Sequence, residues 1–260
     1  MTGVAPFGIL GNLHYTLAGL PLFKDQHIVL NLNLMMTDRN GQPVDFPEAQ
    51  NISLPLPPAM DHTSQLMFSR DLLSSLFQML ISKGGFDADL TGLALRGSVP
   101  MTTSALQTVL PELPQLGAED LPLVVKIRVR GLPVVSLQNG KAMIQLGADI
   151  QVLSHSKSNL TPLFTVNTNI SLSGSFSVTR TKLGISLALE SVSLRADNMG
   201  SFDENALKNW ITNILQMRYL PLINVGLNIG IPLPNIFNLN FGNGVVKTLD
   251  ETLVIHKTPQ

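Results

Sequence analysis

Apolar and polar residues alternate along most of this chain, and a period of two residues predicts β-strands with one buried and one solvated face. An early run at 25–36 places four apolar side chains on one face, namely Ile28, Leu30, Leu32 and Leu34. Between 125 and 194 such runs follow one another, and in 164–178 the polar face is made of asparagines and serines. Near Glu190 and Ser191 the alternation shifts by one residue, which predicts a β-bulge that bends the sheet.

A helical period replaces the alternation from Asp61 to Ser82, where the apolar side chains fall within one half of the helical circumference. Asp61, Thr63 or Ser64 can cap the start of this helix, and Gly84 supplies a stop signal. An apolar face this wide must be covered from more than one direction, so we expect a curved sheet around the helix.

A second helix is predicted from Ser201 to about Tyr219. Ser201 and Glu204 form a capping box at its start, and Pro221 ends it. One side of this helix is apolar and carries Leu207, Trp210, Ile211, Ile214, Leu215 and Met217. Arg218 falls inside the same arc, where we expect its guanidinium to reach solvent and complement the helix dipole.

The remaining segments connect these elements. A proline-rich stretch at 54–60 is typical of an extended connector, and a last strand is predicted near Val245 to Ile255. No internal repeat and no polar linker divides the chain. The order of strand, helix, several strands, helix and strand therefore predicts one α+β fold.

The composition is unusually apolar for a protein in water. Only 13% of the 260 residues are charged, about half the usual share, and 17 basic against 18 acidic residues leave a net charge of −1. This balance argues against a polyanion-binding surface spread over the whole molecule, and we expect no nucleic acid as a partner. No apolar run approaches the ~18 residues of a transmembrane helix. The opening residues lack the basic region of a signal peptide, and the chain could be the excised half of a longer protein whose signal peptide has been lost.

No arrangement of residues in the sequence amounts to an active site. It has no cysteine, its five histidines are scattered, and it lacks the zinc-protease, serine-hydrolase and phosphate-binding motifs. Neighbouring carboxylates occur as Asp87 with Asp89, Glu119 with Asp120, and Asp203 with Glu204. Each pair lies beside Gly, Pro or a helix start, which favours turn and cap chemistry over acid–base catalysis. We therefore expect a protein that is not an enzyme and that needs no metal or other cofactor.

Three cations share one face of a predicted strand. Lys126, Arg128 and Arg130 are spaced ~6.6 Å apart by strand geometry. They could meet the anionic headgroups of phospholipids, or they could simply form the solvated face of an outer strand.

Three glycosylation sequons begin at Asn51, Asn159 and Asn169. Such triplets also arise by chance in a chain rich in Asn and Ser. They favour secretion only in combination with other signs of an extracellular protein.

The apolar faces carry most of the information about function. Two broad apolar helices and several half-apolar strands supply more apolar surface than a small core consumes. This surplus could line a cavity that holds an acyl chain, or it could form a fully packed core. The periodicity of the apolar residues does not distinguish a lipid-holding cavity from a packed core.

The order of these segments resembles the carboxy-terminal half of the BPI/LBP/PLUNC family of lipid-transfer proteins, closest in character to its long PLUNC-like branch. The resemblance covers about Leu54 to Ile255. It rests on the connector and first helix, on the segment 110–153, and on the second helix with its following phrase Gly230-Ile231-Pro232-Leu233-Pro234. Residues 1–53 resemble the central-sheet segment of that family, so the expected parts are 1–53 and 54–260.

This resemblance implies a strongly twisted antiparallel sheet wrapped around a long amphipathic helix plus a second helix, as in BPI-like (TULIP) domains. A lipid-accommodating pocket would lie between them. On this analogy it is lined by Leu72, Leu73, Leu76, Phe77 and Leu80 of the first helix and by Leu207, Ile211, Ile214 and Leu215 of the second. Members of the family are secreted and bind lipopolysaccharide, phospholipid or neutral lipids, mostly without catalysis. The bactericidal members owe their endotoxin affinity to a basic amino-terminal half, so a net charge of −1 argues against lipopolysaccharide neutralisation.

We therefore expect a secreted domain that holds phospholipid or fatty acyl chains and acts in mucosal or innate, antimicrobial defence. Its expected partners are lipid, a membrane or bacterial surface, and the amino-terminal half of the same protein. The alternative is a structural or interaction module with a solid core, whose apolar surplus forms an interface with another chain.

Overall fold

Six antiparallel strands form the main sheet of the computed structural model, in the order β13-β12-β11-β10-β9-β8. The structure describes residues 3–24, 26–45, 63–91, 101–113, 117, 119–195, 202–236 and 239–257. The strands are β8 (Ala88–Thr91), β9 (Leu123–Gln138), β10 (Lys141–Ser156), β11 (Asn159–Val178), β12 (Lys182–Arg195) and β13 (Ile231–Pro232). The four long strands are consecutive in the chain, so each pairs with the next through a short turn.

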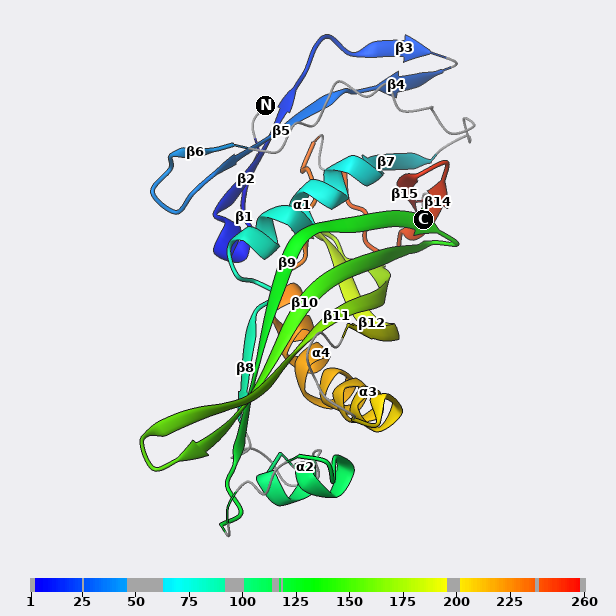
Figure 1. Cartoon of the computed structure of the whole chain (residues 1–260). Helices are drawn as coiled ribbons and strands as arrows, with labels where there is room; N and C mark the ends of the chain where they lie inside the picture. The colour runs from blue at the N-terminus through cyan, green and yellow to red at the C-terminus, as the bar shows by residue number, and fades with distance from the viewer. Residues whose placement is uncertain are drawn as a thin grey trace.

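Breaks in the strand register curve this sheet. Glu190 is an extra residue on β12, because Ser171 pairs with Ser191 while Leu172 pairs with Leu189. The bulge predicted from the alternation is thereby confirmed. Since a bulge increases the local twist, strands β9 to β12 sweep through one curved layer, with α1 at one end and α3 and α4 beside the strands (Figure 1).

The first helix, α1 (Arg70–Ser82), is shorter than predicted. The preceding residues form a strand instead, β7 (Ser64–Ser69), which pairs with β15 (Thr252–Lys257). Leu66 and Phe68 fit a helical arc as well as a period of two residues. Their pairing with strand β15 decides for the strand, because β structure depends on cross-strand neighbours that a local pattern does not contain.

The start of α1 moves accordingly. Ser69 is the N-cap residue, and its hydroxyl accepts a hydrogen bond from the backbone N–H of Leu72 at 3.1 Å. The prediction of Asp61, Thr63 or Ser64 as the cap was wrong, because strand β7 runs from Ser64 to Ser69 before the helix begins; Asp61 itself lies outside the described residues.

The second helix is longer than predicted. It consists of three segments that follow without a break, α3 (Glu204–Ile214), the π-helical turn η2 (Leu215–Tyr219) and α4 (Leu220–Leu227). Pro221, predicted to end the helix, lies in the first turn of α4 instead. A π-turn already interrupts the i−4 hydrogen bonds, so the missing N–H of Pro221 costs little there. The N-cap is Asp203 rather than Ser201, since its carboxylate accepts from the N–H groups of Asn205 and Ala206.

A second sheet is built from the first part of the chain and lies over α1 at the top of Figure 1. Its order is β1-β2-β5-β6, and a separate hairpin pairs β3 with β4. The bounds are β1 (Gly3–Pro6), β2 (Asn12–Leu17), β3 (Leu22–Lys24), β4 (His27–Val29), β5 (Leu32–Thr37) and β6 (Pro43–Val44), with a 3₁₀ turn η1 at Gly8–Leu10. The strand predicted at 25–36 is thus divided, and Ile28 is exposed rather than buried. The predicted boundary between residues 53 and 54 lies outside the described residues.

The last predicted strand is a hairpin. β14 (Val245–Leu249) and β15 are joined by Asp250 and Glu251, both with positive φ, at 44° and 61°. The sequence does not mark this turn, because neither position holds the Gly or Asn that usually adopts such angles.

One short helix was not predicted at all. α2 (Thr103–Val109) begins at the N-cap residue Thr102, whose hydroxyl accepts from the N–H of Ala105. With two turns and few apolar residues, it has too short a helical pattern to stand out in the sequence.

Candidate functional site

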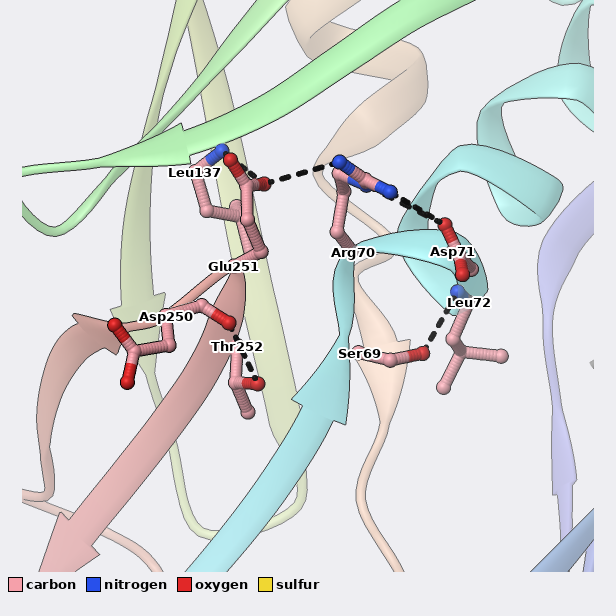
Figure 2. A network of polar contacts seen from close by, with 8 residues as sticks. All are labelled: Ser69, Arg70, Asp71, Leu72, Leu137, Asp250, Glu251 and Thr252. Atoms are coloured by element: carbon pink, nitrogen blue, oxygen red, sulfur yellow. Dashed lines mark hydrogen bonds and ion pairs between the residues drawn. The ribbon is translucent and has the colours of Figure 1, made fainter. Parts of the chain in front are cut away.

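A polar network fixes the start of α1 against the sheets (Figure 2). The guanidinium of Arg70 lies 3.3 Å from the carboxylate of Asp71 and 3.7 Å from that of Glu251. The same Glu251 carboxylate accepts the backbone N–H of Leu137 on β9 at 3.3 Å, and the Glu251 carbonyl accepts the N–H of Arg70 at 3.0 Å. Glu251 therefore joins the first turn of α1 to β9 and to the β14–β15 turn.

Held in this way, α1 presents its apolar face to the interior. Leu73, Leu76 and Phe77 are buried, with 5% or less of each side chain exposed. Leu72 and Leu80 are half-buried at the border of the same face. The five predicted residues of the first helix therefore lie together, although the helix starts later than expected.

The second helix contributes the matching face. Leu207, Ile211, Ile214 and Leu215 are exposed by 2% or less. They belong to one continuous apolar cluster that also contains the buried residues of α1 and of the sheet. Met217, placed on this side by its spacing, is instead 57% exposed. The reason is the π-turn, which starts at Leu215 and changes the helical phase.

Phe86 connects the two helices. Its ring centroid lies 6.0 Å from that of Phe77 on α1, with a tilt of 56° between the rings. Its carbonyl oxygen accepts a hydrogen bond from the Tyr219 hydroxyl at 2.7 Å. Burial, with a further contribution from the charge of Asp87, raises the pKa of Tyr219 far above its usual value, so the phenol stays neutral. Sequence reasoning missed Phe86 and Tyr219, because neither belongs to a periodic apolar run.

The amino-terminal sheet closes one end of this interior. The hydroxyl of Tyr15 on β2 donates to the carbonyl of Pro232 at 2.6 Å, within the Gly-Ile-Pro-Leu-Pro phrase. The phenol is buried, and burial raises its pKa well above the ordinary range. Next to it, η1 approaches the end of α4, because a Cβ on Gly8 would lie 2.7 Å from Cδ1 of Ile229. The nine predicted residues thus share one apolar interior under the amino-terminal sheet.

One open cavity among the described residues lies elsewhere. It has a volume of about 260 Å³ and is lined by Arg180, Thr181, Leu233, Pro234, Asn235, Leu239 and Asn240. None of the nine predicted residues takes part in it. Its volume is just below the ~300–1,000 Å³ of typical small-molecule sites, so it does not by itself explain the apolar surplus.

Two of the three cations predicted on one strand face form ion pairs within the sheet. The guanidinium of Arg128 lies 2.6 Å from the carboxylate of Asp89, and that of Arg130 forms an ion pair with Asp149. Lys126 is half-buried and lies opposite Asp89 in the β8–β9 register. These aspartates offset much of the positive charge that the strand alone would present.

The neighbouring carboxylates have structural roles. Asp87 accepts the N–H of Val129 at 3.0 Å, and Asp203 caps α3 as described above. Asp120 accepts the N–H of Ser104 at the start of α2, and this hydrogen bond lowers the pKa of its carboxyl. Within the described ranges no three His, Cys, Asp or Glu side chains come close enough to hold a metal ion. In the same part of the chain, no helix has the length and apolar content needed to span a membrane.

Two of the three glycosylation sequons lie at exposed positions of the described structure. Asn159 is exposed at the turn between β10 and β11, and Asn169 is exposed on the polar face of β11. Asn51 lies outside the described residues.

Comparison with known proteins decides the family. Residues 12–258 match the C-terminal domain of the LBP / BPI / CETP family. The chain belongs to this family. It is 37% identical to mouse BPI fold-containing family B member 3, covering 98% of this chain and 54% of that protein. It is 32% identical to human BPI fold-containing family B member 4, covering 96% of this chain and 42% of that protein. The chain therefore spans about half the length of these relatives.

A solved structure has the same fold. The crystal structure of lipopolysaccharide binding protein aligns over 99% of this chain and 56% of its own length, with a TM-score of 0.56 at 15% identity. The predicted fold class, a twisted antiparallel sheet with a long and a shorter helix of the BPI type, is confirmed, although the long helix is the second of the two. Neither the family nor the relatives named here are described as enzymes.

Proposed function

We propose that this chain is a lipid-binding domain that holds phospholipid or fatty acyl chains between α1, the α3–η2 helix and the curved sheet. The observation that carries the proposal is the continuous apolar interior to which both helices contribute. Membership of a family of lipid-binding proteins supports the same class of ligand. The nine residues predicted from the sequence form its proposed lining, with Leu72 and Leu80 at the border.

The energetics favour hydrophobic transfer over recognition of the headgroup. An acyl chain that buries about twelve methylene groups gains roughly 10 kcal/mol at ~0.8 kcal/mol per group. Part of this gain offsets the lost freedom of the ligand. The surface ion pairs of Arg128 and Arg130 contribute little to stability and leave little free charge for an anionic headgroup. The stripe at Lys126, Arg128 and Arg130 is therefore a secondary contact in this proposal.

We further propose that the domain works outside the cell, in mucosal or innate defence. The two described sequons at Asn159 and Asn169 are exposed and accessible to glycosylation. The name of the matched crystal structure, lipopolysaccharide binding protein, concerns that protein alone. A net charge of −1 argues for phospholipid or fatty acid here rather than for lipopolysaccharide. The further partners that we propose are a membrane or bacterial surface and the amino-terminal half of the same protein.

Native mass spectrometry of the purified chain, followed by organic extraction and lipid identification, tests the proposal. We expect a phospholipid or fatty acid to copurify in near-stoichiometric amount. A lipid-free mass, together with no uptake of added fluorescent phospholipid, would instead support a structural module with a solid core. The small size of the open cavity at Arg180 is the observation that favours this second function.

A further inference from the structure

The π-turn η2 changes which side of the second helix faces the interior. In α3 the buried residues include Leu207, Ile211 and Ile214. Continued at steps of three and four residues, this series reaches Arg218, Leu222, Val225 and Ile229, which an unbroken α-helix would bury. The structure buries Tyr219, Leu220 and Ile223 in their place. The extra residue of the π-turn has moved the buried face by one position.

This shift resolves the odd position of Arg218. On the α-helical arc its charge would enter the apolar interior. With the π-turn it lies at the border, half-buried, and its guanidinium donates to the carbonyl of Thr91 at 2.7 Å. The expected escape of this side chain from the interior therefore comes from the π-turn and β8, and not from a helix end.

The same shift turns apolar side chains outward. Met217, Leu222, Val225 and Ile229 are exposed by 57%, 50%, 74% and 40%. We call these four residues the outer stripe. Single exposed apolar residues are common on proteins, but these four follow one another along one segment, with Met217 in η2, Leu222 and Val225 in α4 and Ile229 in the turn after it. The polar side of α3, with Asn209 and Asn213, contains no such series.

The chain segment that carries most of the outer stripe has no charged side chains of its own. From Tyr219 to Val246 the chain contains no Asp, Glu, Lys or Arg. Basic residues lie near both ends of the stripe. Arg218 follows Met217 in η2, and Lys182 lies beside Gly230, where a Cβ on the glycine would lie 3.4 Å from the Cβ of Lys182. An uncharged apolar face between cations complements a phospholipid surface, with an apolar layer beneath phosphate groups.

We propose that the outer stripe docks this domain on a phospholipid bilayer. The inference rests on the proposed lipid-binding function, because the opposite face of the same helix lines the proposed lipid site. The stripe is short, about 10 Å from Leu222 to Ile229 at 1.5 Å per residue, so it supports shallow and reversible contact. The helix thus separates the bilayer from the apolar interior by its own thickness.

Vesicle flotation of the full chain tests the proposal. The vesicles contain phosphatidylcholine with a minor fraction of phosphatidylserine. The test variant is Leu222→Glu with Val225→Glu, and the matched control is Asn209→Glu with Asn213→Glu on the polar side of α3. All four positions are exposed, so neither variant disturbs the core. We expect binding to weaken by at least about tenfold in the test variant and to change little in the control.

Uptake of a short-chain phospholipid below its micelle concentration separates this inference from the proposed function. We expect both variants to keep wild-type uptake. Equal vesicle binding by both variants overturns the outer stripe as a docking surface. So does a wild-type dimer in solution that only the test variant breaks, because a second copy would then cover the stripe. Vesicle binding without any lipid uptake would overturn the proposed function and leave the docking surface intact.

Discussion

At the scale of single residues, glycines show where the backbone leaves no room for a side chain. Gly11 has a φ of 104°, and a Cβ there would overlap the carbonyl oxygen of Thr37 on β5. Gly19, by contrast, has an ordinary φ, and a Cβ added to it would meet no other atom within 4 Å. Gly11 and Gly19 therefore serve as a test position and its control for the effect of an added Cβ.

We expect Gly11→Ala to destabilise the protein by more than about 2 kcal/mol, because both the left-handed backbone and the contact with Thr37 oppose a Cβ. Gly19→Ala should be neutral or stabilising by up to about 1 kcal/mol. Chemical denaturation measures both. Equal stability of the two variants would contradict the close approach of β2 and β5.

The protein has two tyrosines, and both phenols are buried donors. Burial raises the pKa of Tyr15 and of Tyr219 in the folded protein, while in the unfolded chain each titrates near 10. The folded state thus holds its phenolic protons more tightly. The stability that this contributes is complete below pH ~10 and is lost as the pH rises above that value.

We therefore expect alkaline unfolding in which tyrosinate absorbance and loss of circular dichroism appear together. A variant with Tyr15→Phe and Tyr219→Phe lacks this pH dependence, although each lost hydrogen bond costs about 1 kcal/mol at neutral pH. Tyrosinate that forms in the native protein near pH 10 would show that the phenols are open to solvent.

At the scale of elements, the β14–β15 turn combines backbone strain with a structural task. Asp250 and Glu251 both adopt left-handed angles, which disfavour residues with a side chain by roughly 1–2 kcal/mol each. Only Glu251 uses its side chain to hold α1 and β9, through Arg70 and Leu137. A substitution can therefore remove the backbone strain at Asp250 without loss of contacts, whereas at Glu251 it would also remove the contacts of the side chain.

We expect Asp250→Gly to raise the free energy of unfolding by up to about 1 kcal/mol, since glycine accepts the left-handed angle. Glu251→Gly should gain nothing or lose stability, because the contacts to Arg70 and Leu137 disappear with its carboxylate. Thermal denaturation of the two variants in parallel measures the difference. The same gain in both would mean that the network of Figure 2 contributes nothing.

Elements also show how far the sequence could predict this fold. The meander β9–β12, its bulge at Glu190 and the buried faces of both helices follow from periodicity, which is a local property. Strand β7 and the turn at Asp250 do not, because they depend on pairing between residues far apart in the chain. The π-turn is likewise invisible, since Leu222 continues the helical series whether or not the phase shifts. The nine residues of the proposed site lining could be predicted from the sequence, but Phe86 and Tyr219 could not.

At the scale of the whole molecule, helices and three sheets contribute to one apolar interior, so the proposed binding of a ligand there is coupled to folding. A lipid that binds only the native state stabilises it by about 2.7 kcal/mol at a free concentration of a hundred times its Kd. For a chain of this length, each kcal/mol shifts Tm by about 2–4 °C.

We therefore expect a short-chain phospholipid to raise Tm by several degrees in differential scanning fluorimetry, in a manner that saturates with its concentration. Glycerophosphocholine, which has the headgroup without acyl chains, serves as the control and should leave Tm unchanged. A shift with the control compound, or no shift with the lipid, would contradict hydrophobic binding in the interior.

The pairing of β7 with β15 has a consequence for synthesis. On the ribosome, the meander β9–β12 is complete once residue 195 has emerged, and its contacts are between neighbours. Strand β7 and the first turn of α1 emerge much earlier but find their partners only when residues 251–257 follow. Through this interval Phe68 and the start of α1 lack their partners on β15 and Glu251, so the nascent domain is most exposed to aggregation and to chaperones just before its last hairpin is made.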